Sequence, residues 1–271
     1  MPCKNCNKNL SSEVNFCDSC GAKVIRNRLT IKNLLEHFSE TYFDYDNKFL
    51  QTFITLFTQP HAVIGTYIEG TRKKYVNAVN YFVIALTLSG FQIFFINKFF
   101  PELLDVDFLS QEGAENFQKE NMNFVQEYNS IIYILIVPIY ALISKIVFLD
   151  FKKYNYTEHL VANMYLAAHL SIVSSIIIII TFFLGFNFAM VGILVAPIQI
   201  VFSAYCFKRL FNLNLKKILL RTILFLLIIG GLFIILIALV SIVMYYNGTM
   251  DAIIEAKKVA IEAAKQAQQT K

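Results

Sequence analysis

The chain has 271 residues, of which 56% are hydrophobic and 16% are charged, with 24 Lys and Arg against 19 Asp and Glu. Soluble domains carry about 25% charged residues, and disordered chains have few apolar ones. The composition therefore excludes both classes and predicts a membrane protein. Trp is absent, so tyrosine pairs such as Tyr154 with Tyr156 are expected to occupy the lipid headgroup zone.

Two Cys-x-x-Cys motifs lie within the first twenty residues and are separated by ten residues. This spacing is typical of a small zinc ribbon, in which each motif supplies two thiolates to one tetrahedral ion. Asn7 and Gly21 follow the two motifs at the position where a left-handed turn lets backbone N–H groups point at sulfur. We therefore predict a ribbon over residues 1–25 with Zn as its cofactor, bound by Cys3, Cys6, Cys17 and Cys20.

The compartment of this N-terminal ribbon follows from its cysteines and its flanks. No basic region followed by a short apolar stretch precedes them, so a cleavable signal peptide is not expected and the N-terminus should stay cytoplasmic. Reducing conditions there keep thiols available for zinc. The alternative is that the four cysteines form disulfides, which an exported location would favour.

Residues 30–75 are expected to form amphipathic, interfacial helices. Apolar residues recur at helical spacing after Thr30, again from Asp46 to Thr58, and a short third piece follows Pro60 and ends at Gly70. These pieces are too short to cross a membrane. Their apolar faces must be buried either at the headgroup boundary or against the cytoplasmic face of the membrane domain.

Five later stretches are long and apolar enough to cross, because about 20 residues at ~1.5 Å each match a ~30 Å hydrocarbon core. The fold class is therefore mostly α: a five-span transmembrane helical bundle over residues 76–246, with amphipathic cytoplasmic helices and a small N-terminal zinc ribbon. The predicted spans are residues 76–96, 130–149, 160–184, 188–207 and 222–246.

Charge beside the spans predicts their orientation. Ten basic residues fall on one side: Arg72, Lys73, Lys74, Lys152, Lys153, Lys208, Arg209, Lys216, Lys217 and Arg221. The loop 97–129 instead carries seven acidic residues against Lys98 and Lys119. By the positive-inside rule, we predict a multi-pass protein of the bacterial inner membrane with a cytoplasmic N-terminus. An odd number of spans places residues 247–271 outside the cytoplasm, as a solvated helical tail or a helix that pairs through its thin apolar stripe.

Polar residues inside the spans are candidates for a binding site, because they are costly in hydrocarbon. His169 and Gln199 lie near the middle of the third and fourth spans and are predicted to face one interior cavity. The alternative is that they bond to each other, or to a carbonyl freed by Pro138 or Pro197, and only hold helices together.

A second polar set gathers at the cytoplasmic ends of the first and third spans. Cations with amide and imidazole groups suit an anionic lipid headgroup. The alternative is that these residues only set the orientation and cap helices. The predicted lipid-binding residues of this set are Arg72, Lys73, Lys74, Asn80, Glu158 and His159.

The order of these parts resembles the bacterial domain-of-unknown-function 3667 family, which joins a four-cysteine ribbon to a multi-pass membrane domain. The resemblance rests on Cys3-x-x-Cys6 with Phe16-Cys17-x-x-Cys20-Gly21, on the run Pro60–Ile64 leading to Tyr67–Tyr75, and on Tyr156-x-Glu158-His159-Leu160-Val161. It implies the fold and a membrane location, and it implies no activity.

Three functions are compatible with these features. The first is an interaction or scaffold protein, not an enzyme, whose ribbon and basic face recruit a cytoplasmic protein partner; no HExxH, GxSxG or P-loop motif occurs in the sequence. The second is a carrier of lipid or a small solute through the region of His169 and Gln199. The third, a membrane-tethered nucleic-acid-binding regulator, is disfavoured because Phe16 is the one aromatic residue before Phe38 that can stack on bases.

Overall fold

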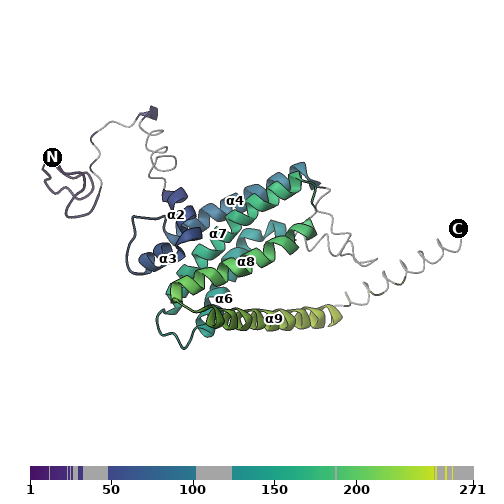
Figure 1. Cartoon of the computed structure of the whole chain (residues 1–271). Coiled ribbons are helices and arrows are strands. Elements are labelled where there is room, and N and C mark those ends of the chain that lie inside the picture. Colours follow the sequence, from purple (N-terminus) through teal and green to yellow (C-terminus); the bar gives the residue numbers. More distant parts are fainter. Residues whose placement is uncertain are drawn as a thin grey trace. The chain divides into compact units, whose positions relative to one another are not determined.

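The structure is a computed structural model that describes residues 1–11, 13–22, 24, 26, 30–32, 48–101, 124–186, 188–246, 248, 254 and 258. The chain divides into two compact units, Met1–Lys48 and Phe49–Lys271 (Figure 1). The helix predicted from Thr30 lies outside the described residues beyond its first three positions. The predicted tail 247–271 also lies outside them, apart from three single residues.

The first unit contains the predicted ribbon. Cys3, Leu10 and Cys17 form its small buried core, and Val14, Ala22 and Val24 pack against them. Backbone N–H groups of Leu10 and Val24 donate to the carbonyls of Met1 and Asn15, at 2.8 and 2.9 Å. A core of this size buries little apolar surface, so the fold of this unit depends on its cysteine cluster.

The second unit begins with α2 (Lys48–Thr58) and α3 (Pro60–Ile68), as the sequence predicted. Pro60 stands at the start of α3, where its missing N–H has no helical partner to lose. Thr52 and Leu56 of α2 are buried, and Phe53 packs against the core of the bundle. The bundle thus buries part of α2, while Leu50, Ile54 and Phe57 of the same helix remain exposed.

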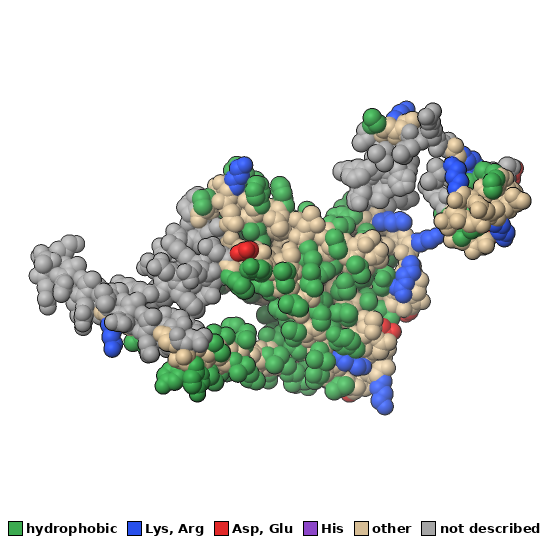
Figure 2. Space-filling model, turned by 180° about the vertical axis from the view of Figure 1, so that it is seen from behind, with side chains coloured by type: hydrophobic (Ala, Val, Ile, Leu, Met, Phe, Trp, Pro, Cys, Tyr) green, Lys and Arg blue, Asp and Glu red, His purple; other side chains and the backbone are tan. Residues whose placement is uncertain are grey.

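Among the residues that the structure describes, five further helices are long and apolar enough to span a membrane, which confirms the predicted fold class. They are α4 (Ala78–Phe99), α6 (Asn129–Val147), α7 (Tyr156–Phe183), α8 (Phe188–Phe211) and α9 (Leu215–Tyr246). The protein is therefore an integral, multi-pass membrane protein. In the part of the chain that the structure describes, hydrophobic side chains cover the helices on the face shown in Figure 2.

Two spans begin earlier than the sequence predicted. Asn155 caps α7 through a reciprocal pair of bonds with Glu158, so the polar first turn is helical. α9 begins at Leu215 instead of residue 222, which places Lys216, Lys217 and Arg221 on its first turns. Hydropathy marks where a helix enters hydrocarbon, whereas caps and backbone hydrogen bonds decide where the helix starts.

α7 is the central helix of the bundle, packed against α4, α6, α8 and α3 (Figure 1). Its buried face contains small residues such as Ala162 and Ala168 and several serines, which allow close helix approach. α9 contacts α6 and α8 along its first half, and its most apolar window contains no buried residue. That window is suited to contact lipid.

Successive spans alternate in direction, so the α3–α4, α6–α7 and α8–α9 connections share one end, here called the basic end. Cross-contacts support this arrangement. Lys153 Nζ donates to the Leu210 carbonyl at 3.0 Å, and Arg221 pairs with Asp150. Several Lys and Arg side chains mark this end of the bundle in Figure 2.

Candidate metal centre and buried polar sites

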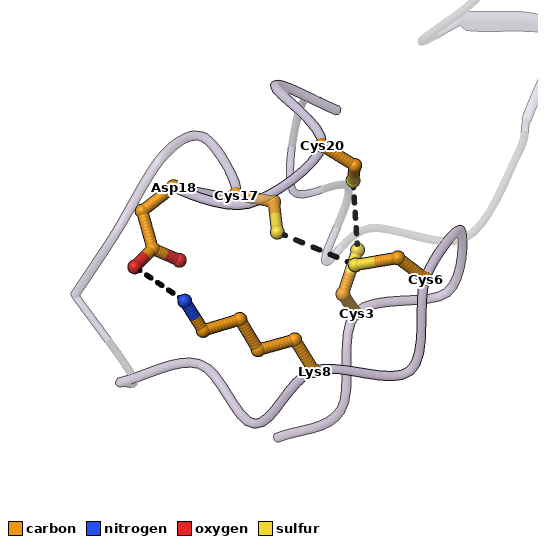
Figure 3. Close-up of polar contacts among 6 residues, drawn as sticks. All are labelled: Cys3, Cys6, Lys8, Cys17, Asp18 and Cys20. Atoms are coloured by element: carbon orange, nitrogen blue, oxygen red, sulfur yellow. Dashed lines mark hydrogen bonds and ion pairs between the residues drawn. The ribbon is translucent and has the colours of Figure 1, made fainter.

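The four cysteines predicted as metal ligands converge on one point (Figure 3). Their sulfur atoms all lie within 4.8 Å of one another. The closest pairs join the two motifs, with Cys3 to Cys20 at 3.7 Å and Cys6 to Cys17 at 3.6 Å. These distances are far longer than a disulfide bond of about 2.05 Å. The group can therefore hold a metal ion.

The two motifs have the same backbone design. Asn7 and Gly21 have φ angles of 59° and 70°, which confirms the left-handed turns predicted for both positions. Each turn is closed by two backbone bonds of matching length. These bonds run from Cys3 N to Lys8 O at 2.8 Å, Asn7 N to Cys3 O at 2.8 Å, Cys17 N to Ala22 O at 2.9 Å and Gly21 N to Cys17 O at 2.8 Å.

Hydrogen-bond donors around two of the sulfurs, those of Cys3 and Cys20, favour the thiolate form. The backbone N–H groups of Cys6 and Asn5 hold the pKa of the Cys3 thiol below its ordinary value. The Asn5 side chain and the Ala22 backbone lower the pKa of Cys20 to about 6. Cys6 is the exception: although the Lys8 backbone N–H lowers it, the Cys20 side chain and burial raise the pKa of its thiol to about 12. Thiolates are the form that binds metal ions, so one cysteine of each motif is prepared for a cation.

An exposed ion pair links the two halves of the ribbon, with Lys8 Nζ 2.8 Å from Asp18 Oδ2 (Figure 3). Their hydrogen bond raises the pKa of Lys8 and lowers that of Asp18. Because both side chains are exposed, the pair contributes little to stability. Phe16, two positions before Asp18 in the chain, is 54% exposed, a large apolar side chain on a small unit.

His169 is fully buried and hydrogen-bonds through Nδ1 to the hydroxyl of Tyr81, at 3.0 Å. Aromatic rings surround it: Phe57 and Phe53 of α2 have ring centroids at 4.3 and 4.9 Å, and Phe202 of α8 stacks at 5.0 Å. Its Nε2 has no hydrogen-bond partner among the described residues. The site is thus an aromatic box with one polar contact.

Gln199 does not share this environment. Its Nε2 donates to Ser174 Oγ at 3.0 Å, so the alternative reading, a bond between His169 and Gln199, does not occur. Gln199 lines two cavities and His169 lines neither, so the predicted shared cavity is not found among the described residues. Each predicted polar residue of the spans has a partner that lies on a different helix and was not foreseen.

His159 belongs to a second buried cluster, between α6 and α7. Its Nδ1 lies 2.9 Å from Ser144 Oγ, and Asn163 Nδ2 donates to the same oxygen at 3.0 Å. A serine beside a histidine is the pattern of an activated nucleophile. Ser144, however, is fully buried and donates to the Ala141 carbonyl at 2.9 Å. The geometry therefore suits helix packing.

The other residues of the predicted headgroup site take local roles. Arg72 donates to the Tyr67 carbonyl at 2.6 Å and lies over the Tyr67 ring, 4.1 Å from its centroid. Lys74 lies 5.1 Å from the Tyr75 ring centroid, and Lys73 is exposed. The Asn80 backbone N–H donates to Asn77 Oδ1, and Glu158 completes the α7 cap. His159 is inside the bundle, whereas these cations lie on an exposed connection.

A hollow of about 420 Å³ at the basic end gathers other cations. It lies between α3, the α6–α7 connection and the end of α8, and its charged residues are Glu69, Lys153, Lys208 and Arg209. In the sequence, the three cations of this hollow indicated only the orientation of the spans. No sequence pattern indicated that these cations lie close together. The chain turns back after the end of α8 at Asn212, which has a left-handed φ of 52°.

Comparison with known families gives one match. The family described as protein of unknown function (DUF3667) matches residues 46–90. This confirms the predicted resemblance. The DUF3667 segment comprises α2, α3 and the first half of α4, and it supplies Phe53, Phe57 and Tyr81 of the His169 box. The ribbon and the stretch Tyr156–Val161 lie outside it. No curated protein and no solved structure matches the chain.

Proposed function

We propose that the protein is a membrane scaffold whose zinc-loaded ribbon recruits a cytoplasmic protein partner. The observation that carries this proposal is the ribbon itself, a compact unit separate from the bundle with its own ligand cluster. A unit with so small a core typically serves as a docking or stabilising module.

Zinc is the metal that fits the cluster best. Four thiolates are typical of structural zinc, with Zn–S bonds of about 2.3 Å, which places tetrahedral sulfurs about 3.8 Å apart. The 3.7 and 3.6 Å separations across the two motifs agree with this spacing. All four coordination positions would be filled by protein, as in a closed structural site.

The ribbon surface supplies the proposed contact. Phe16 is an exposed aromatic residue, the type that anchors interfaces, and the exposed Lys8–Asp18 pair adds a polar contact to the same unit. A role in binding instead of catalysis is supported by the burial of Ser144, the side chain that stands beside a histidine.

A photo-crosslinking amino acid in place of Phe16 is expected to yield one discrete protein adduct in cells. The adduct should disappear when Cys6→Ser prevents metal binding, because the ribbon surface then no longer forms. The same crosslinker at Tyr246, which is 81% exposed on α9, is the control and should not yield that adduct. An adduct that persists unchanged in the Cys6→Ser variant would contradict recruitment by a folded ribbon.

We propose further that the basic end faces the cytoplasm of a bacterium, with an extracytoplasmic C-terminus. Two matched substitutions test this. Lys98 ends α4 and Lys216 begins α9, at opposite ends of the bundle, and both are exposed. An impermeant maleimide should label Lys98→Cys in intact cells and Lys216→Cys only after lysis, relative to the wild type. The reverse pattern would overturn the orientation.

A further inference from the structure

Two cavities adjoin along α7. The first, of about 400 Å³, is a partly open cavity lined by α6, α7, α8 and α9, and it is largely apolar, with walls such as Ile136, Leu170 and Phe225. The second, of about 320 Å³, lies between α4, α6, α7 and α8, toward the end opposite the basic end. Tyr133 and Gln199 line both cavities. The two spaces therefore meet at these residues.

The second cavity is polar but uncharged. No Asp, Glu, Lys, Arg or His is among its described lining residues. Uncharged hydrogen-bonding groups come instead from four helices. They include the side chains of Ser89, Gln92, Asn129, Ser174, Ser175 and Gln199. Polar groups at this depth are costly unless they are bonded, so a concentration of them points to a ligand or to water.

The hydrogen bonds within this wall leave capacity for a ligand. Gln92 Oε1 accepts from Ser175 Oγ at 2.9 Å, which leaves its amide N–H groups. Gln199 Nε2 donates to Ser174 at 3.0 Å and Asn129 Nδ2 donates to Ser89 at 2.9 Å, which leaves two carbonyl oxygens. The wall thus offers both donors and acceptors that are held in place from neighbouring helices.

We propose that the two cavities together bind one uncharged amphiphile, with a hydroxyl-bearing headgroup in the polar cavity and its hydrocarbon chain in the apolar one. The α7 residues that line the two cavities extend from Asn163 to Ile178. At ~1.5 Å per residue, this stretch of helix is about 22 Å long, which suits one acyl chain with its headgroup. This site is independent of the ribbon and of the recruitment proposed for it.

Charge decides against an anionic lipid. A phosphate in the second cavity would meet no cation among the described lining residues, and burying it without one is costly. The first cavity contains Arg221, but that guanidinium is paired with Asp150 and bonded to the Val147 carbonyl. An uncharged headgroup is therefore the one that can hydrogen-bond to the Gln and Asn side chains without needing a counter-ion.

A pair of glycine substitutions tests the proposal. Gly192 of α8 lines the second cavity, whereas Gly90 of α4 lines neither cavity. A Cβ at either position would meet no atom within 4 Å, and neither has a positive φ. Gly192→Phe should therefore fill the site without backbone strain, and Gly90→Phe is its matched control on the outside of a span.

The measurement is native mass spectrometry of protein from nanodiscs of phosphatidylethanolamine. The nanodiscs also contain monoglucosyl-diacylglycerol and phosphatidylglycerol, in equal amounts and with identical acyl chains. The wild type and Gly90→Phe should retain the glucosyl lipid in preference, and Gly192→Phe should retain about tenfold less. Preferential retention of phosphatidylglycerol, or equal retention of both lipids by all variants, would overturn the proposal.

A second pair of substitutions changes the polar groups of the cavity without filling it. Gln92→Leu removes the amide donors at nearly constant volume, and Gln51→Leu makes the same change on the exposed face of α2. Gln92→Leu should lose most of the preference for the glucosyl headgroup while Gln51→Leu keeps it. A preference that survives Gln92→Leu would contradict headgroup recognition in the polar cavity, even if Gly192→Phe fails to insert.

Discussion

Cys17→Ser is expected to abolish zinc binding and unfold the ribbon while the bundle stays folded and inserted. Cys17 is both a ligand candidate and one of the three buried residues of the ribbon core. Loss of one thiolate therefore removes coordination and packing together, in a unit too small to compensate. The bundle has a separate core built by α2 to α9, so its unfolding temperature should not change.

The chain offers a matched control in its fifth cysteine. Cys206 is buried in α8 of the second unit and is not part of the four-cysteine cluster, so Cys206→Ser should keep one zinc per protein by metal analysis. Acid should release the metal from the wild type, because protons compete for thiolates. Zinc retained by Cys17→Ser, or lost from Cys206→Ser, would refute the assignment of the ligands.

Local features were predictable from the sequence because neighbouring residues decide them. The two cysteine turns need a left-handed residue after each motif, and Asn7 and Gly21 occupy these positions in the structure. The spans are equally local, since apolar length alone selects them. Their starts were less predictable, because the capping bonds of Asn155 extend α7 through residues that hydropathy assigns to a loop.

The contacts that build the buried sites were not predictable, because they join residues far apart in the chain. Tyr81 and His169 are separated by 88 positions, and Gln92 and Ser175 by 83. Sequence position placed His169 and Gln199 at similar depth, but helix rotation turns them toward different partners. Packing of whole helices sets that rotation, and it is not encoded in any short motif.

Substitutions of Tyr81 and His169 test whether the hydrogen bond in the aromatic box stabilises the fold. Tyr81→Phe leaves His169 Nδ1 buried without its partner, and His169→Leu does the same to the Tyr81 hydroxyl, since both residues are fully buried. Each single change should cost about 1–3 kcal/mol, whereas the double variant should be close to the wild type because no polar group is stranded. Thermal unfolding followed by circular dichroism measures the four proteins.

Tyr128→Phe is the control for this cycle, because Tyr128 is 39% exposed and its hydroxyl can bond to water. It should change stability by less than about 0.5 kcal/mol. Recovery in the double variant means that the hydrogen bond between His169 and Tyr81 satisfies both groups and holds the family-matched part of α4 to α7. If both single variants are as stable as the wild type, the bond contributes nothing to the fold. The unpartnered His169 Nε2 would then be the feature of the box that still needs a ligand.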